Sequence, residues 1–166
     1  DNSDYYKLQG MNPDGVRDPS LKVLVDVDNL IDYMNIIFYT GNFDAPVSSF
    51  MNNKGPNNFF AIYNRNDDRG FTFIAHDNEH TLLSVPVPGN PNNGINENRV
   101  NIGSLRSGNK MEVSSFDKFH PQWLHFRLSQ NTEYRQRFAD KAYQLFYNQG
   151  IFTPEMAAAL FKKRTL

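Results

Sequence analysis

The chain contains no cysteine among its 166 residues. A disulfide framework, thiolate catalysis and thiolate zinc sites are therefore excluded. No apolar run approaches the ~20 residues that a bilayer-spanning helix needs, so we expect no membrane span. The formal net charge is only −1, which provides no overall attraction to nucleic acid or to an anionic membrane surface. We therefore expect no nucleic-acid partner.

Aromatic side chains, by contrast, are abundant, with 14 Phe and 8 Tyr. This content argues against disorder, and a chain of this length can bury a substantial core. No internal repeat or sharp change in composition divides the sequence. We expect a single domain over residues 1–166 in the α+β class, helical toward its end. Because the chain begins at Asp1 without a methionine, we expect it to be part of a longer polypeptide.

Hydrophobic periodicity predicts a helix over residues 28–39. Asp28 is a suitable N-cap, and Gly41 is a suitable stop. The apolar residues of this segment recur at the i, i+3, i+4 spacing of one helix face: Leu30, Ile31, Met34, Ile37 and Phe38. We also expect a short helix near residues 5–8 and a surface loop over residues 86–110.

Three further helices are predicted in the last third of the chain, over residues 121–128, 132–147 and 153–161. Proline favours the first position of a helix, which is where Pro121 stands. Residues 116–125 include Trp123 and two histidines. We interpret this group as a helix N-terminus with Trp123 in the core.

Two aromatic runs, residues 58–64 and 71–76, flank a polar turn and predict a β-hairpin. If the turn is centred between residues 67 and 68, Asn58 and Asp77 are directly opposite each other. Directly opposed residues have Cβ atoms ~5 Å apart, which is close enough to share a metal ion. Mg²⁺ prefers carboxylate and amide oxygens, so this pair is a candidate magnesium site.

Asp44 follows the predicted helix and precedes the hairpin. Protein kinases use this order: a base on the catalytic loop, an Asn, and then a metal-binding Asp. Asp44, Asn58 and Asp77 therefore form a candidate phosphoryl-transfer group. Asp and Asn are also favoured in turns for purely structural reasons, so a structural role for the three residues stays open.

Residues 76–80, His-Asp-Asn-Glu-His, match the H-x-x-E-H string of inverted zinc peptidases. That chemistry needs a helix, which places both histidines on one face. The string instead follows a strand-like run, and in a strand positions 76 and 80 are ~13 Å apart. The peptidase interpretation therefore requires a helix that the sequence does not predict.

Several segments, taken in order, resemble the sequences of the CotH kinase family. Members of this family are atypical protein kinases similar to spore-coat protein H. The resemblance covers nearly the whole chain. It is carried by residues 26–34 (DVDNLIDYM), 38–44 (FYTGNFD), 57–60 (NNFF), 71–82 (FTFIAHDNEHTL), 121–125 (PQWLH), 133–140 (EYRQRFAD) and 145–150 (LFYNQG).

The resemblance implies an atypical protein-kinase-like C-lobe, helical with a β-hairpin that carries the metal-site residues. It implies ATP and Mg²⁺ as cofactors and Ser of secreted, surface or coat proteins as the phosphate acceptor. By position, Asp44 resembles the catalytic Asp, and Asn58 and Asp77 resemble the metal ligands. Glu79 stands where many members have a second Asp, and we assign it to the metal as well. An extracellular or cell-surface bacterial location is the matching expectation.

The sequence departs from a complete kinase in one large respect. We find no phosphate-cradling Gly-rich loop and no strand-borne Lys upstream of Asp44 that pairs with a helix Glu; Lys22 is the only candidate. We expect the N-lobe to lie elsewhere in the longer chain and this fragment alone to be inactive. The alternative is a non-catalytic surface or spore-coat module with a structural or binding role.

Overall fold

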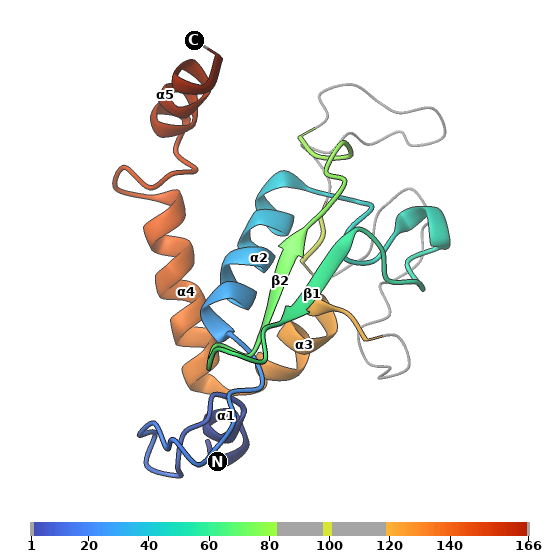
Figure 1. Cartoon of the computed structure of the whole chain (residues 1–166). Coiled ribbons are helices and arrows are strands. Elements are labelled where there is room, and N and C mark those ends of the chain that lie inside the picture. The colour runs from blue at the N-terminus through green and yellow to red at the C-terminus, as the bar shows by residue number, and fades with distance from the viewer. Residues whose placement is uncertain (1, 83–97, 101–118, 166) are drawn as a thin grey trace.

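A computed structural model describes residues 2–82, 98–100 and 119–165 (Figure 1). The fold is built around α2, which contacts the two-stranded sheet and helices α3 and α4. The α+β class expected from the sequence is confirmed. In chain order the elements are α1 (Ser3–Leu8), α2 (Val27–Thr40), the 3₁₀ helix η1 (Ser49–Met51), β1 (Phe59–Tyr63), β2 (Phe71–Ala75), α3 (Pro121–Leu128), α4 (Thr132–Phe146) and α5 (Pro154–Thr165).

Helix α2 begins one residue earlier than the sequence predicted. Asp26, not Asp28, is its N-cap, and the Asp26 carboxylate accepts a hydrogen bond from the backbone N–H of Asn29 at 3.0 Å. Asp28 lies in the first turn and pairs with Arg137 of α4 at 2.7 Å. The predicted stop at Gly41 is confirmed, because this residue adopts the left-handed conformation with φ 60° that glycine tolerates best.

The apolar face of α2 forms the centre of the hydrophobic core. Four of the five residues predicted for this face are buried, and Leu30, Met34 and Ile37 have no exposed surface. Phe38 is partly buried and packs against the core. Burial of such side chains is the main favourable contribution to folding. The core also contains residues of α1, β2, α3 and α4: Tyr5, Phe73, Leu124 and Tyr134.

The hairpin is present, but its register differs by one residue from the predicted register. Phe59 pairs with Ala75, and the backbone N–H of His76 donates to the Asn58 carbonyl at 3.2 Å. The prediction that Asn58 directly opposes Asp77 is therefore wrong. The connection, residues 64–70, has an odd number of residues and is centred on Asp67, not between residues 67 and 68.

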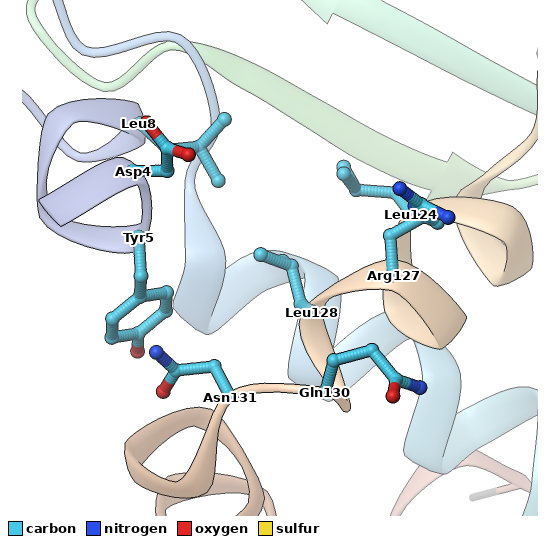
Figure 2. A pocket seen from close by; sticks show the side chains of 8 residues that line it. All are labelled: Asp4, Tyr5, Leu8, Leu124, Arg127, Leu128, Gln130 and Asn131. Atoms are coloured by element: carbon cyan, nitrogen blue, oxygen red, sulfur yellow. The ribbon is translucent and has the colours of Figure 1, made fainter. Parts of the chain in front are cut away.

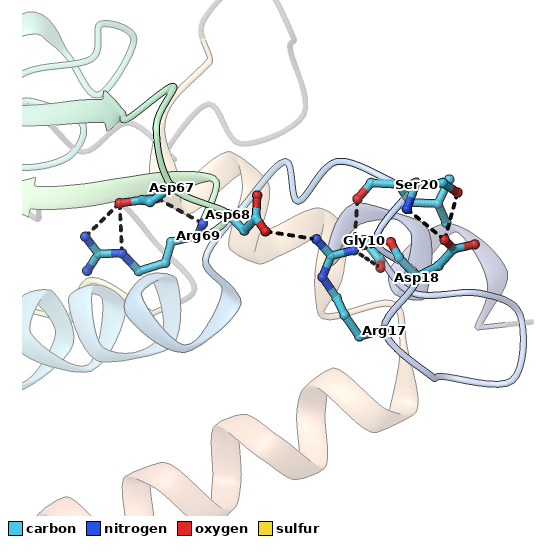
Figure 3. Close-up of polar contacts among 8 residues, drawn as sticks. Gly10, Arg17, Asp18, Ser20, Asp67, Asp68 and Arg69 are labelled. Atoms are coloured by element: carbon cyan, nitrogen blue, oxygen red, sulfur yellow. Dashed lines mark hydrogen bonds and ion pairs between the residues drawn. The ribbon is translucent and has the colours of Figure 1, made fainter.

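Side-chain hydrogen bonds within this connection account for its length. The Asn64 side chain accepts from the backbone N–H of Asn66 and donates to the Asp67 carboxylate, each at 3.0 Å. Asp67 in turn accepts from the backbone and guanidinium of Arg69 (Figure 3). Such Asx turns compete with ladder pairing. Arg17, from the N-terminal loop, reaches the same connection through Asp68 at 3.7 Å.

The C-terminal helices follow the prediction closely. His120 caps α3 by accepting from the backbone N–H of Trp123 at 3.0 Å, and Asn131 caps α4 in the same way. Trp123 packs against the core, as the sequence predicted. Helix α5 extends away from the other elements (Figure 1) and has no buried residue. Its last turn ends four residues beyond the predicted end.

Two sequence predictions, the surface loop over residues 86–110 and the absence of a membrane span, can be tested only on the described residues. Within the predicted loop, residues 86–97 and 101–110 are outside the described residues. Arg99, between them, has no exposed surface, so at this position the expected surface loop is wrong. Across the described parts of the chain, no helix combines the length and the apolar composition needed to cross a bilayer.

The Asn29 side chain joins α2 to the sheet by hydrogen bonds. Asn29 donates from its amide to the Phe73 carbonyl at 3.1 Å and accepts from the Phe73 backbone N–H at 2.5 Å. The Asn29 amide thus completes the hydrogen bonds of β2 on the side away from β1. Both backbone groups belong to a buried residue, so losing this partner leaves them unsatisfied, which costs about 1–3 kcal/mol.

We expect Asn29→Ala to lower the free energy of unfolding by about 1–3 kcal/mol, measured by urea denaturation. Asn66→Ala, in the exposed hairpin connection, is the matched control and should cost less than about 1 kcal/mol. Equal effects of the two substitutions would show that the Asn29 side chain does not hold α2 to the sheet.

A second prediction concerns His125 of α3. Its ring lies against Phe38 and Phe138, with centroids 5.5 and 4.8 Å away, and its Nδ1 is 2.8 Å from the Tyr134 hydroxyl. Burial lowers the pKa of His125 to about 4. The unfolded chain takes up this proton near pH 6.5, whereas the folded chain resists it down to about pH 4.

Stability should therefore fall by roughly 1–3 kcal/mol as the pH is lowered from 7 to 4, and the decline should be smaller in His125→Gln. His76→Gln, at an exposed position, should retain the wild-type pH dependence. Chemical denaturation at a series of pH values provides the measurement. An unchanged slope in His125→Gln would assign the acid sensitivity to other groups.

Candidate functional site

The loop after α2 places Asp44 beside the hairpin. The Asn42 side chain accepts from the Asp44 backbone N–H at 2.9 Å and donates to the Asn78 side chain at 3.0 Å. Asn42 is fully buried, and its bond to the Asp44 backbone is buried with it, whereas Asn78 is exposed. The two bonds fix the segment that follows α2 against the segment that follows β2. The sequence did not identify Asn42 as part of the site.

Asp44 lies inside this junction, and the residue as a whole is 7% exposed. One carboxylate oxygen accepts from the Asn58 amide at 2.7 Å, and the other accepts from the Ser48 hydroxyl. No Lys or Arg of the described residues forms an ion pair with Asp44. The predicted association of Asp44 with Asn58 is thus present, as a direct hydrogen bond between their side chains.

Asn58 reaches Asp44 from an unusual backbone conformation. Its φ is 51°, in the left-handed region, which Asn tolerates better than most residues. This conformation stands immediately before β1, at the point where the chain changes direction into the hairpin. The bond to Asp44 uses the amide nitrogen of Asn58, and a metal ion would use the amide oxygen. The two roles are therefore compatible.

The turn after β2 brings two further ligand-type side chains to Asp44. One ligand atom from each of Asp44, Glu79 and His80 lies within 4.8 Å of the other two. Glu79 Oε1 and His80 Nε2 are 3.2 Å apart. The His80 ring packs against both Phe43 and Phe50, with centroid distances of 4.9 and 5.0 Å. From the sequence, Glu79 was predicted to bind a metal, whereas His80 was predicted as a ligand only under the peptidase interpretation.

Asp77 is not in this group of ligand atoms. It follows β2 in the left-handed conformation, with φ 52°, and its side chain is exposed. The structure therefore unites Asp44 with Asn58 and Glu79, but it leaves Asp77 at the edge. Residues 76–80 form no helix, and the exposed His76 packs on Phe60. The zinc-peptidase interpretation lacks the helix it requires.

Buried Arg99 supports the same loop from the other side. Its guanidinium donates to the Asn53 side chain at 3.3 Å and to the Val47 carbonyl. Its own carbonyl accepts from the Gln122 side chain at 2.7 Å. These bonds tie the loop between α2 and β1 to α3. No pattern in the sequence marks an arginine within an Asn-rich segment as a buried residue.

A separate hollow of about 380 Å³ lies between α1 and α3 (Figure 2). None of the candidate site residues lines it. Its walls are largely apolar, and the charged lining residues are Asp4 and Arg127. The full lining is Asp4, Tyr5, Leu8, Leu124, Arg127, Leu128, Gln130 and Asn131. Asp44, Glu79 and His80 lie at the end of the hairpin where β1 begins and β2 ends, and none of them lines this hollow.

Comparison with known proteins identifies no family. No protein-family model matches the chain, and neither the curated proteins nor the solved structures contain a match. The function must therefore be argued from the site itself.

The site makes a specific prediction for Asn58. Asn58→Gly retains the left-handed backbone but removes the donor to the buried Asp44 carboxylate. A buried charged acceptor that loses its partner costs about 1–3 kcal/mol, so thermal and urea denaturation should show a decrease of this size.

Asn52→Gly is the matched control, because Asn52 also has a left-handed φ of 56° but is exposed. Glycine there should change stability by less than about 0.5 kcal/mol. A comparable loss in both variants would trace the effect to backbone entropy and not to the Asp44 bond.

Proposed function

We propose that this chain is the C-lobe of a CotH-like atypical protein kinase, which transfers phosphate from ATP to Ser of secreted, surface or coat proteins. The observation that carries the proposal is the 2.7 Å bond from Asn58 to Asp44. It joins two residues 14 positions apart, and the hairpin and an acidic turn follow them. This is the order of parts in a kinase catalytic loop.

Each residue has a distinct role in the proposed reaction. Asp44 orients the Ser hydroxyl and accepts its proton, while Asn58 holds Asp44 in place. The Asn58 amide oxygen, Asp77 and Glu79 bind Mg²⁺ on the ATP phosphates, since carboxylate and amide oxygens suit this ion. Phosphoryl transfer depends on positioning and on charge neutralisation. The exposure of Asp77 and Glu79 leaves them accessible to a nucleotide.

The hairpin also presents an apolar surface that fits a partner lobe. Phe60 and Ile74 are cross-strand partners, 54% and 46% exposed, and Ile62, two residues along β1, is 49% exposed. Residues i and i+2 of a strand share a face, so these three side chains form one exposed patch. Contiguous apolar patches commonly mark interaction surfaces. A preceding N-lobe, with the nucleotide between the lobes, is the occupant that the proposal requires.

The proposal predicts that the longer protein transfers the γ-phosphate of radiolabelled ATP to a Ser-containing protein, whereas the 166-residue chain alone transfers little or none. In the longer protein, Asp44→Asn and Asp77→Asn should each reduce the rate by about 10²-fold or more. Asp68→Asn, in the exposed hairpin connection, is the matched control and should retain full activity.

Full activity in Asp44→Asn or in Asp77→Asn would remove that residue from the mechanism. Strong transfer by the isolated chain would contradict the requirement for a second lobe. Thermal melts of each variant show whether a lost activity reflects lost folding.

One observation favours a second candidate, a non-catalytic surface or coat module. The Asp44 carboxylate is almost fully buried, and both of its oxygens accept hydrogen bonds from neighbouring side chains. A carboxylate held in this way can be purely structural. This candidate requires that Asp44→Asn lower the melting temperature while the longer protein shows no phosphate transfer in any form.

A further inference from the structure

Asp44, Glu79 and His80 converge at the end of the hairpin where β1 begins and β2 ends. Asp44 comes from the loop after α2, while the other two come from the turn after β2, 35 and 36 residues later. Their ligand atoms lie within 4.8 Å of one another. We infer that these three side chains form a binding site for a divalent first-row transition metal, of the Zn²⁺ or Mn²⁺ class.

The distances suit one ion. Metal–ligand bonds of ~2.1 Å place neighbouring ligand atoms of a tetrahedral zinc ~3.4 Å apart. Glu79 Oε1 and His80 Nε2, at 3.2 Å, already have this separation. The remaining distances, up to 4.8 Å, need a small further approach. The Glu79 side chain is exposed, so it can rotate toward Asp44 without displacing buried side chains.

The charge at this point also calls for a cation. Asp44 is more than nine-tenths buried, and in the described ranges neither Asp44 nor Glu79 has a Lys or Arg partner. Buried charges in proteins are generally paired or coordinate metals. Among the residues that the structure describes, the basic group at the site is His80, which contacts Glu79. A divalent ion would offset both carboxylates at once, and a neutral imidazole would supply the third ligand.

The surroundings hold two of the ligands in place. The Asn58 and Ser48 donors orient the Asp44 carboxylate. A carboxylate has about four acceptor positions, so these two bonds leave positions for a metal. The His80 ring contacts Phe43 and Phe50. Such outer partners typically change metal affinity by about 10–100-fold.

The nature of the ligands selects the metal. Mg²⁺ and Ca²⁺ prefer all-oxygen sites, whereas imidazole nitrogen suits zinc and its first-row neighbours. Three protein ligands leave open positions on the ion, which is typical of exchangeable or catalytic centres and not of closed structural ones. This site does not rest on the proposed phosphotransfer. It uses Asp44 as a ligand, so an ion bound there and the action of Asp44 as a base exclude each other.

The experiment is isothermal titration calorimetry of ZnCl₂ into the 166-residue chain without nucleotide. We expect one-to-one binding, with the affinity reduced about tenfold or more in His80→Gln and in Glu79→Gln. Both are side chains outside the core, and circular dichroism melts verify that the variants fold. His76→Gln, which alters an exposed histidine four residues away, is the matched control and should bind zinc as the wild type does.

Two results would overturn the inference: the absence of one-to-one binding, or equal affinity in wild type and His80→Gln. Repeating the titration in millimolar Mg²⁺ tests the metal class, because full displacement of zinc by Mg²⁺ would mean that the nitrogen ligand is not used. Asp77→Asn separates the two proposals. It should reduce phosphate transfer in the longer protein by about 10²-fold or more but leave zinc binding unchanged.

Discussion

The local structure around the candidate site depends on one constraint, the burial of the Asp44 carboxylate. A buried carboxylate must receive hydrogen bonds or a counter-ion. Asn58 and Ser48 supply the hydrogen bonds, and each draws a different part of the loop toward Asp44. Asn58 does so from a left-handed backbone at the entrance to β1. The start of the hairpin is therefore set by a polar bond and not by apolar packing alone.

The same loop is held from two further directions. Asn42 binds the segment after β2, and Arg99 binds the loop to α3. A loop with buried polar groups is stable only when those groups are satisfied. The many Asn residues of this region, which alone look like turn formers, include several buried hydrogen-bonding side chains. This explains how a segment with little apolar character can lie in the interior, where Asn42 and Asn53 have no exposed surface.

The elements that were predicted well are those with strong local signals. Helix α2 follows from its apolar period and the C-terminal helices from their caps, because both signals lie within a few residues of the element that they define. The hairpin register failed because it depends on the length of the connection, which the alternation of apolar residues does not reveal. Asn64 and Asp67 bond within the connection and lengthen it to an odd number of residues, and a shift of one residue changes which side chains oppose each other.

The candidate site was predicted only in part, because some of its contacts depend on the hairpin register and on partners distant in sequence. The association of Asp44 with Asn58 was expected from chain order and is present. The pairing of Asn58 with Asp77 depended on the register and failed with it. His80 was weighed only within a five-residue string that needs a helix, although its actual neighbours are Asp44 and Glu79. Arg99 could not have been identified, because burial of a charged residue depends on partners distant in sequence.

The electrostatics of the site limits what it can bind. Two carboxylates converge there without a Lys or Arg among the residues that the structure describes, so the site favours a cation over an anion. An ATP phosphate could approach only with its charge offset by a metal ion. The choice of ligand atoms then determines which metal ion the site prefers. Amide and carboxylate oxygens alone suit Mg²⁺ and phosphoryl transfer, whereas recruitment of the His80 nitrogen favours a transition metal. Because Asp44 is the proposed base for phosphoryl transfer and also a ligand of the proposed transition-metal site, the ion that occupies the site determines whether this carboxylate can act as a base.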